Sequence, residues 1–257
     1  MLILLPPSEG KAAPAQGEAL DLAALSFPEL SADRHRVLEA LSTASAHPEA
    51  LSVLGVGPSL GHEVARNLRL LEDASAPAHQ IYNGVLYDAL GYSTLTPVQR
   101  ARAAASILVI SGLWGAVALN DRIPAYRLSM STALPGLGRL SSFWKPRLAA
   151  PLAQRAADEL VIDCRSSAYS AAWHSRPERT VEIKVFQESA GKRTVVSHFA
   201  KHTRGEFVRH LLSRRGKAPA TAADLLRIAG ERWQAELVEG TARHPQALHL
   251  VLEAPGA

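Results

Sequence analysis

Three short apolar runs constrain the fold of this chain more than any other feature of its sequence. They lie at residues 2–5, 107–110 and 160–164, and the third includes Asp163; Pro6-Pro7, Ser111-Gly112 and Arg165 follow the three runs. Runs this short predict buried strands, because a buried helix needs about 10 residues or more. Long stretches with helical periodicity separate them. The sequence therefore predicts an α/β (mixed α+β) fold, with a mixed central sheet flanked by helices.

The remaining elements follow from periodicity and from turn residues. Residues 180–186 alternate with period two, which predicts a half-exposed strand. A hairpin turn at Gly191-Lys192 would join it to a partner over residues 194–199, and 248–252 predict a last strand. Helices are expected over 31–43, 48–54, 62–71, 97–105, 146–159, 201–215 and 221–228, the last with Thr221 and Asp224 as a capping pair. Residues 120–141 predict a long loop with short ordered pieces. Since no repeat or linker divides the chain, we expect a single domain over residues 1–257.

Polar side chains follow all three predicted buried strands, in residues 8–11, 111–114 and 165–169. In open α/β sheets, ligands bind beyond the carboxyl ends of the strands. If the three strands are parallel neighbours, these groups converge on one pocket that suits a phosphate or a nucleotide. The dispersed candidates for such a site are Lys11, Arg127, Trp144, Lys145, Ser166 and Tyr169. The alternative is that Lys11, Arg127 and Tyr169 are separate structural anchors.

A second candidate is the glycine turn in residues 51–60, whose pattern is typical of a helix-hairpin-helix element spanning about 48–71. Gly55 and Gly57 permit a tight turn and close backbone approach. A helix from about Ser59 would point its free N–H groups at a phosphate, which the helix dipole also favours. The alternative is a plain helix-to-helix turn in which glycine caps the first helix.

A third candidate is the basic helix over residues 201–217, which includes Lys201 and Arg204. Arg and Lys side chains on such a face suit phosphates, and the net charge of +4 is compatible with a polyanionic partner. Two alternatives are a solvated surface helix and a membrane-surface helix. The apolar face is short and lacks Trp, which argues against the membrane.

The sequence lacks the motifs of several classes of protein, among them the common nucleotide-binding folds, zinc proteins and membrane-spanning proteins. The sequence has no phosphate-binding loop of the Gly-x-x-x-x-Gly-Lys type and no Gly-x-Gly-x-x-Gly after a strand. The ten His residues are scattered without zinc spacing, so we expect no metal and no cofactor. The one cysteine, Cys164, can form no internal disulfide, and we expect it to be buried as a small hydrophobe. No apolar run approaches the roughly 20 residues that span a bilayer. We expect a cytoplasmic protein.

Seven segments of the chain, each a weak signal alone, together form a specific pattern. They are residues 1–11, 82–87, 111–115, 124–130, 143–145, 163–169 and 197–205. In this order, over nearly the whole chain, they resemble the YaaA family of peroxide-stress, DNA-binding proteins. The resemblance implies an unusual mixed α/β fold that contains a helix-hairpin-helix element and a positively charged cleft. It also implies resistance to hydrogen peroxide and a lower pool of free intracellular iron, an effect that we expect to be indirect.

On this basis we predict a DNA-binding stress protein of low sequence specificity, for single- or double-stranded DNA. Lys11, Arg127, Lys145, Lys201 and Arg204 would line the basic cleft, and Gly55, Gly57 and Ser59 would hold a backbone phosphate. Ser166 would join this phosphate site, while Trp144 and Tyr169 would stack on an unpaired base. Affinity would then be mostly electrostatic and would fall steeply with salt.

Two rival functions stay open at this point. One is an enzyme that acts on a nucleotide or on damaged DNA, with Lys11 as the candidate catalytic residue. Neighbouring cations would lower the pKa of Lys11 enough for it to form a Schiff base. The other is a non-catalytic sensor of small nucleotides.

Overall fold

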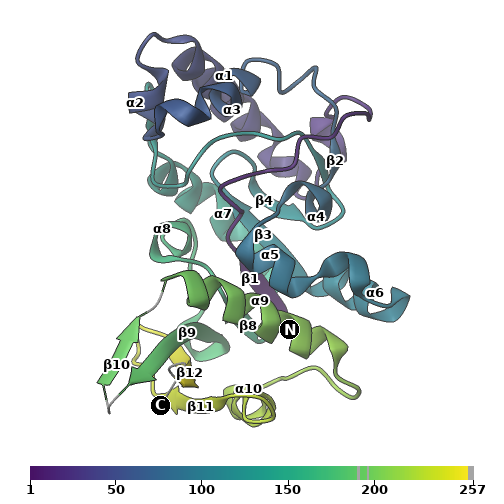
Figure 1. Cartoon of the computed structure of the whole chain (residues 1–257), viewed down its shortest axis with the longest axis vertical. Helices are drawn as coiled ribbons and strands as arrows, with labels where there is room; N and C mark the ends of the chain where they lie inside the picture. Colours follow the sequence, from purple (N-terminus) through teal and green to yellow (C-terminus); the bar gives the residue numbers. More distant parts are fainter. Residues whose placement is uncertain (190–191, 196, 254–257) are drawn as a thin grey trace.

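The computed structural model describes residues 1–189, 192–195 and 197–253, and its centre is a mixed sheet (Figure 1). The strand order is β11-β12-β9-β8-β1-β3-β4, and β10 also pairs with β9. These strands are β1 (Leu2–Leu5), β3 (Ile107–Ser111), β4 (Gly115–Ala118), β8 (Val161–Asp163), β9 (Thr180–Ser189), β10 (Lys192–Val195), β11 (Gln234–Val238) and β12 (Gln246–Glu253). The predicted mixed α/β fold is confirmed.

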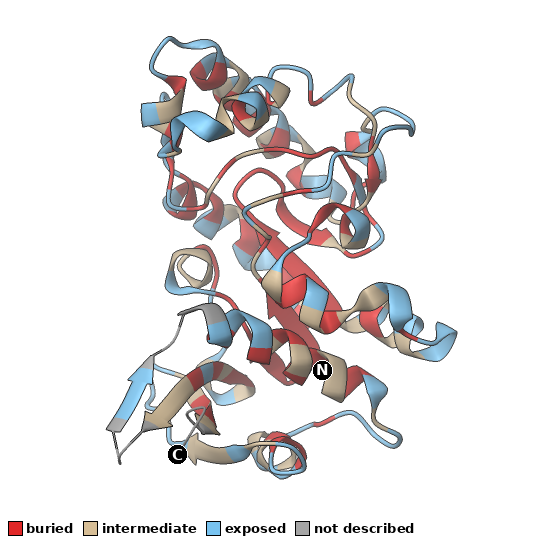
Figure 2. Ribbon diagram, in the orientation of Figure 1, coloured by how far each residue is buried: buried red, intermediate tan, exposed pale blue. Residues whose placement is uncertain are grey.

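The three apolar runs form the middle of this sheet as parallel neighbours. Ile3 of β1 pairs with Ile107 of β3 on one side and with Ile162 of β8 on the other. All four residues of β1 are fully buried, and Figure 2 shows the central strands in red. A parallel strand covered on both faces has no polar side, which explains runs that are apolar without alternation. β9 and β12 extend the parallel part, whereas β4, β10 and β11 run antiparallel to their partners.

Helices and short strand pairs surround the sheet (Figure 1). The helices are α1 (Ser31–Ala46), α2 (Ala50–Leu54), α3 (Gly61–Arg66), α4 (Ala78–Ile81), α5 (Val85–Leu90), α6 (Pro97–Ser106), α7 (Leu140–Ala156), α8 (Ser167–Ser170), α9 (Ser197–Ser213) and α10 (Ala222–Ala229). Residues 120–141 hold short strands, as predicted: β5 (Arg122–Ile123) pairs with β2 (Ala76–Pro77), and β6 (Ala133–Leu134) pairs with β7 (Gly138–Arg139). The capping pair Thr221 and Asp224 is confirmed as a reciprocal capping box.

The structure moves several predicted boundaries. Helix α7 begins at Leu140 and contains Pro146, because Leu140, Trp144 and Leu148 bury one helical face that outweighs the missing N–H of proline. Helix α3 ends at Arg66, short of residue 71. The partner strand of the hairpin ends at Val195, since α9 already starts at Ser197. Strands β4 and β11 were not predicted. Gly191 of the predicted turn lies outside the described residues.

Helices α5 and α9, which both contribute residues to the candidate site described below, pack closely side by side. It depends on Gly205 in the middle of α9. A Cβ atom at this position would lie 2.2 Å from the carbonyl oxygen of Leu86 and 2.8 Å from the Cβ of Ala89. Only glycine allows the two helices to approach this closely. In the part of the chain that the structure describes, no helix is long and apolar enough to cross a bilayer.

Candidate functional site

The three polar groups follow β1, β3 and β8, which run parallel and therefore end at the same edge of the sheet. Residues 8–10 of the first group and Ser166 and Tyr169 of the third line what we call the carboxyl-edge cavity, which has a volume of about 610 Å³. Residues 111–114 do not line this cavity, so the predicted convergence on one pocket holds for two of the three groups. Its wall includes six of the predicted site residues: Gly55, Arg127, Ser166, Tyr169, Lys201 and Arg204. A cavity of this size, with apolar walls and a few polar groups, is typical of a ligand site.

Residues 6–10 line this cavity as a loop, which we call the floor loop, and Lys11 follows this loop without lining the cavity itself. Its Nζ donates to the carbonyl oxygens of Ser8 (2.8 Å) and Glu9 (3.1 Å). The hydroxyl of Ser8 donates to the Gly10 carbonyl and accepts from the Asn83 N–H at 3.2 Å. Lys11 is buried, and it forms a backbone bridge with Tyr82. The Lys11 side chain therefore holds the backbone of the floor loop in place.

A buried network of hydroxyl groups lies next to Lys11. The Ser111 hydroxyl accepts from the N–H groups of Leu113 and Trp114, both at 3.1 Å, and lies 2.7 Å from the Tyr126 hydroxyl. Tyr126 in turn lies 3.1 Å from the Tyr82 hydroxyl. Because Ser111 accepts twice, its own proton is free to point at Tyr126. Burial raises the pKa of both tyrosines, so this network is neutral.

The electrostatics of Lys11 differ from those of a surface lysine. Its Nζ lies 4.2 Å from the centre of the Tyr126 ring. Burial, to which the Arg127 charge adds, lowers the pKa of Lys11 from 10.5 to about 7, against the opposing effect of Glu63 and Glu9. Lys11 is therefore divided between its charged and neutral forms near neutral pH.

Arg127 is fixed from both sides. The Asn67 side chain accepts from the Arg127 N–H and donates to its carbonyl, both at 2.9 Å, and so imitates a strand pair. The Arg127 Nη1 pairs with Glu63 at 3.3 Å, and its Nη2 lies 4.0 Å from a Glu9 carboxylate oxygen. The side chain is only 16% exposed. This arrangement holds one guanidinium at the wall of the cavity in a set position.

Helix α9 supplies two more cations. The Lys201 side chain is 55% exposed, and its Nζ lies 4.0 Å from the second carboxylate oxygen of Glu9. Arg204 is half-buried and donates to the Ile183 carbonyl through Nε at 3.1 Å and Nη2 at 2.9 Å. The packing of α9 on α5, which Gly205 allows, brings both side chains to the cavity.

A buried ion pair shapes the segment that follows β8. Arg165 donates to both carboxylate oxygens of Asp163, at 2.8 and 2.6 Å, and also to the carbonyls of Tyr169 and Trp173. Burial alone would raise the pKa of Asp163, but the Arg165 charge and hydrogen bonds together hold it below its usual value. The pair fixes α8, which carries Tyr169 and follows its N-cap residue Ser166.

The glycine turn lies at the rim of the cavity. Gly55 has φ +64°, and the N–H groups of Gly55 and Val56 bond to the Ser52 and Leu51 carbonyls, which is the Schellman cap of α2. Gly57 has an ordinary φ of −75° and precedes the 3-10 helix η3 (Pro58–Leu60), which carries Ser59. Gly57 and Ser59 do not line the cavity. Short helices thus flank the turn, and the helix-hairpin-helix assignment stays a prediction.

Two predicted site residues lie elsewhere. Trp144 is fully buried in α7, and its Nε1 donates to the Gly112 carbonyl at 2.8 Å. The prediction that Trp144 stacks on an unpaired base is therefore corrected, because the ring has no exposed face in this structure. Its neighbour Lys145 is exposed but does not line the cavity. Burial lowers the pKa of His174, and the charges of Arg165 and Lys145 add to this effect. Cys164 is fully buried, and burial raises the pKa of its thiol to about 12, as expected for a small hydrophobe.

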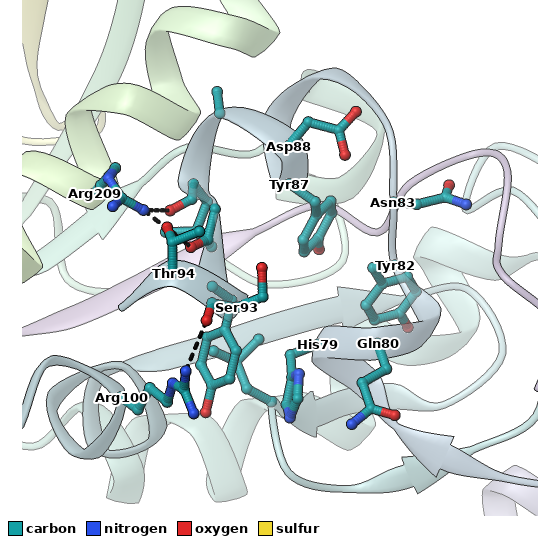
Figure 3. A pocket seen from close by; sticks show the side chains of 15 residues that line it. His79, Gln80, Tyr82, Asn83, Tyr87, Asp88, Ser93, Thr94, Arg100 and Arg209 are labelled. Carbon is teal, nitrogen blue, oxygen red and sulfur yellow. Dashed lines mark hydrogen bonds between the residues drawn. The ribbon is translucent and has the colours of Figure 1, made fainter. Parts of the chain in front are cut away.

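A second cavity, of about 760 Å³, lies beside α5 and shares Asn83 and Tyr87 with the first. We call it the His79 cavity (Figure 3). The His79 ring stacks on Tyr92 with 4.0 Å between centroids, and burial lowers the pKa of His79. Both arginines of this cavity bond to backbone: Arg209 to the Leu90 and Gly91 carbonyls, and Arg100 to the Ser93 carbonyl. Nothing in the sequence had indicated this cavity.

Sequence reasoning missed several residues that shape the carboxyl-edge cavity. Glu9 lies between two predicted cations in space, and its position beside Lys11 in the chain was the available signal. Asn67 and Glu63 hold Arg127 from a helix about 60 residues away, which no local pattern reveals. Within the described ranges, no group of three His, Cys, Asp or Glu side chains could hold a metal ion; the expectation of no metal stays a prediction.

Comparison with known proteins covers nearly the whole chain. A family model described as peroxide stress protein YaaA matches residues 1–236. A UPF0246 protein of Streptomyces coelicolor is 49% identical over 231 residues, which span 88% of each chain. A UPF0246 protein of Corynebacterium efficiens is 41% identical over 90% of this chain and 93% of its own. A third, from Corynebacterium glutamicum, is 37% identical over 98% of this chain and 100% of its own. The chain therefore belongs to the peroxide stress protein YaaA family.

Proposed function

We propose that this peroxide stress protein binds DNA through the cations of the carboxyl-edge cavity. The observation that carries the proposal is the gathering of Arg127, Lys201 and Arg204 around one cavity, whose lining has a single carboxylate, Glu9, among the residues that the structure describes. Arg and Lys side chains in such an arrangement suit phosphate groups. Because these contacts read no bases, the binding would be of low sequence specificity.

The glycine turn supports the same proposal from the rim. Gly55 lines the cavity, and Gly57 and Ser59 follow it in the chain. A Cβ atom at Gly57 would meet nothing within 4 Å, and its φ is ordinary. The fold therefore does not itself require glycine at position 57, whereas the close approach of a DNA backbone would. Protection of DNA against peroxide, with an indirect effect on free iron and a cytoplasmic location, belongs to the same proposal.

Fluorescence anisotropy with labelled duplex, single-stranded and abasic oligonucleotides, across a salt series, tests this function. We expect log K to fall linearly with log salt. The double variant Lys201→Gln/Arg204→Gln should bind weakly and lose about one unit of that slope for each phosphate contact removed. Lys217→Gln, an exposed residue outside the cavity, is the matched control and should bind nearly as the unchanged protein. Absence of binding at low salt would refute the proposal.

One observation favours a second candidate function, an enzyme acting on damaged DNA. Burial and Arg127 bring the pKa of Lys11 to about 7, so a neutral amine is available at neutral pH. In an abasic substrate, the Lys11 nitrogen would attack the sugar aldehyde and form a C=N bond with loss of water. Because Lys11 is buried and does not line the cavity, this reaction requires the floor loop to open. Borohydride would reduce the C=N bond to a stable amine and leave protein on the DNA. No trapped adduct, or an adduct that persists in Lys11→Met, would exclude this candidate.

A further inference from the structure

The carboxylate of Glu9 occupies the space between two cations of the carboxyl-edge cavity. One oxygen lies 4.0 Å from Arg127 Nη2, and the other lies 4.0 Å from Lys201 Nζ. Both distances exceed those of a hydrogen bond. The Glu9 side chain is also 79% exposed. Charge alone therefore holds this carboxylate, and a competing anion can displace it at little cost.

The backbone of Glu9 is fixed while its side chain is not. Lys11 donates to the Glu9 carbonyl at 3.1 Å, and the Ser8 hydroxyl donates to the Gly10 carbonyl. Displacement of the carboxylate would therefore need only side-chain rotation, and the floor of the cavity would stay in place. The Glu9 carboxylate thus occupies the position in which an anionic ligand would pair with Arg127 and Lys201.

The cations that Glu9 would leave behind are already oriented. Arg127 is held by Asn67 and Glu63, and Arg204 is held by the Ile183 carbonyl. Oriented groups lose little conformational freedom when a ligand binds, which favours affinity. An anion that replaces the Glu9 carboxylate would thus bind to arginine side chains that are already oriented.

Beside these cations the cavity has an apolar wall. It is formed by Pro7, Leu54, Val56, Leu86, Leu128 and Tyr169. The volume of about 610 Å³ lies within the range of pockets for small ligands. A ligand that matches both parts carries an anion at one end and a flat apolar body at the other.

The geometry points to a nucleoside monophosphate as the ligand, its phosphate replacing the Glu9 carboxylate between Arg127 and Lys201 and its base packing on the apolar wall. This inference deepens the proposed function, because it rests on the same cavity. It predicts a terminal phosphate in preference to the phosphates within a strand. A phosphate monoester carries about −1.5 to −2 charges at neutral pH, whereas a carboxylate or a phosphodiester carries one. The monoester is therefore the anion best suited to expel Glu9.

Isothermal titration calorimetry with deoxyadenosine 5′-monophosphate, deoxyadenosine and inorganic phosphate tests the inference on the whole chain. We expect the monophosphate to bind at least tenfold more tightly than either of the other two. Glu9→Gln should tighten its binding about threefold or more, because the internal competitor is removed. Glu39→Gln removes the same charge from an exposed position of α1 and should leave the affinity unchanged. Lys201→Gln should weaken binding.

Three results would overturn the inference. The first is a monophosphate that binds no more tightly than the nucleoside, and the second is one that binds no more tightly than inorganic phosphate. The third is an equal effect of Glu9→Gln and Glu39→Gln. Closed circular duplex DNA, which has no terminal phosphate, separates this test from the proposed function. Salt-sensitive binding of the circle without monophosphate binding would refute the inference alone. Monophosphate binding without any DNA binding would refute the proposed function alone.

Discussion

The two cavities beside α5 differ in what their cations do. In the larger His79 cavity, Arg209 and Arg100 donate to backbone carbonyls at 2.9 and 2.7 Å. In the smaller carboxyl-edge cavity, Arg204 likewise donates to a backbone carbonyl, that of Ile183, at 2.9 Å. Lys201 and the Nη2 of Arg127 instead face the loosely held carboxylate of Glu9, at 4.0 Å. Two cations of this cavity therefore keep charge that a ligand can pair with, and Arg204 adds its charge from a fixed position. The availability of charge, and not the size of a cavity, therefore marks the candidate site.

Among single substitutions compared at one pH, a change at the helix contact that both cavities share should cost the most stability. Gly205→Val would place a Cβ atom 2.2 Å from the Leu86 carbonyl and force α9 away from α5. We expect a loss of about 3 kcal/mol in the free energy of unfolding, measured by urea denaturation. Gly61→Ala is the control, because a Cβ atom at Gly61 meets nothing within 4 Å. Equal stability of the two variants would show that the close contact is not needed.

A substitution in the His79 cavity is expected to lower the free energy of unfolding and to leave the affinity for DNA nearly unchanged. Arg209→Gln removes two hydrogen bonds from the last carbonyls of α5, at Leu90 and Gly91. We expect urea denaturation to show a loss of about 2 kcal/mol, since a hydrogen bond to a charged group contributes roughly 1.5–3 kcal/mol. The affinity for DNA should change little beyond the effect of one charge, as in Lys217→Gln. A large loss of DNA affinity with unchanged stability would reverse our assignment of the two cavities.

The floor of the carboxyl-edge cavity should make stability depend on pH. The folded pKa of Lys11, about 7, lies below the ordinary value of 10.5. Between these values the unfolded chain binds more protons, so Lys11 makes stability rise with pH by about 1.4 kcal/mol per unit. Its destabilising effect is complete below pH 7 and is relieved as the pH approaches 10.5. Urea titrations from pH 6 to 10 should show a smaller rise in Lys11→Met than in Lys217→Met. Identical slopes in these two variants would contradict a buried, perturbed Lys11.

Substitutions of the two glycines at the rim should change the free energy of unfolding least, and by different amounts. Gly57→Ala should change the free energy of unfolding by less than about 0.5 kcal/mol, because its φ is ordinary and the space is open. Gly55→Ala should cost about 1 kcal/mol, because Gly55 adopts φ +64°. A fall in DNA affinity in Gly57→Ala, measured by anisotropy, would support close approach of a backbone there. Unchanged affinity would remove the turn from the proposed DNA site.

The sequence predicted the centre of the fold better than its edges. The buried strands were recognisable because full burial favours apolar runs, and their parallel order placed two of the three predicted polar groups at one cavity. Strand β4, Gly115–Ala118, consists mainly of small residues with no alternation, so no local pattern revealed it. The start of α7 was missed because Pro146 reads as a first-turn residue, while the packing of Leu140 and Trp144 extends the helix before it.

The candidate site was predictable in its cations but not in their environment. Lys201 and Arg204 were visible as part of a basic helix, and Arg127 as an isolated cation in a loop. The orientation of each guanidinium depends on partners that are distant in the sequence: Glu63 and Asn67 for Arg127, and the Ile183 carbonyl for Arg204. Burial likewise separates Trp144, which the fold needs, from Tyr169, which lines the cavity. Such long-range contacts leave no trace in local spacing.

A nuclear magnetic resonance titration of the labelled protein with a short duplex at low salt shows directly which of the two cavities binds DNA. We expect the amide signals of Ser129, Ser166 and Lys201, around the carboxyl-edge cavity, to shift with increasing DNA and to recover on addition of salt. The amide signals of Tyr92 and Thr94, in the His79 cavity, should stay in place. Salt-sensitive shifts confined to Tyr92, Thr94 and their neighbours would contradict the claim that available charge marks the site.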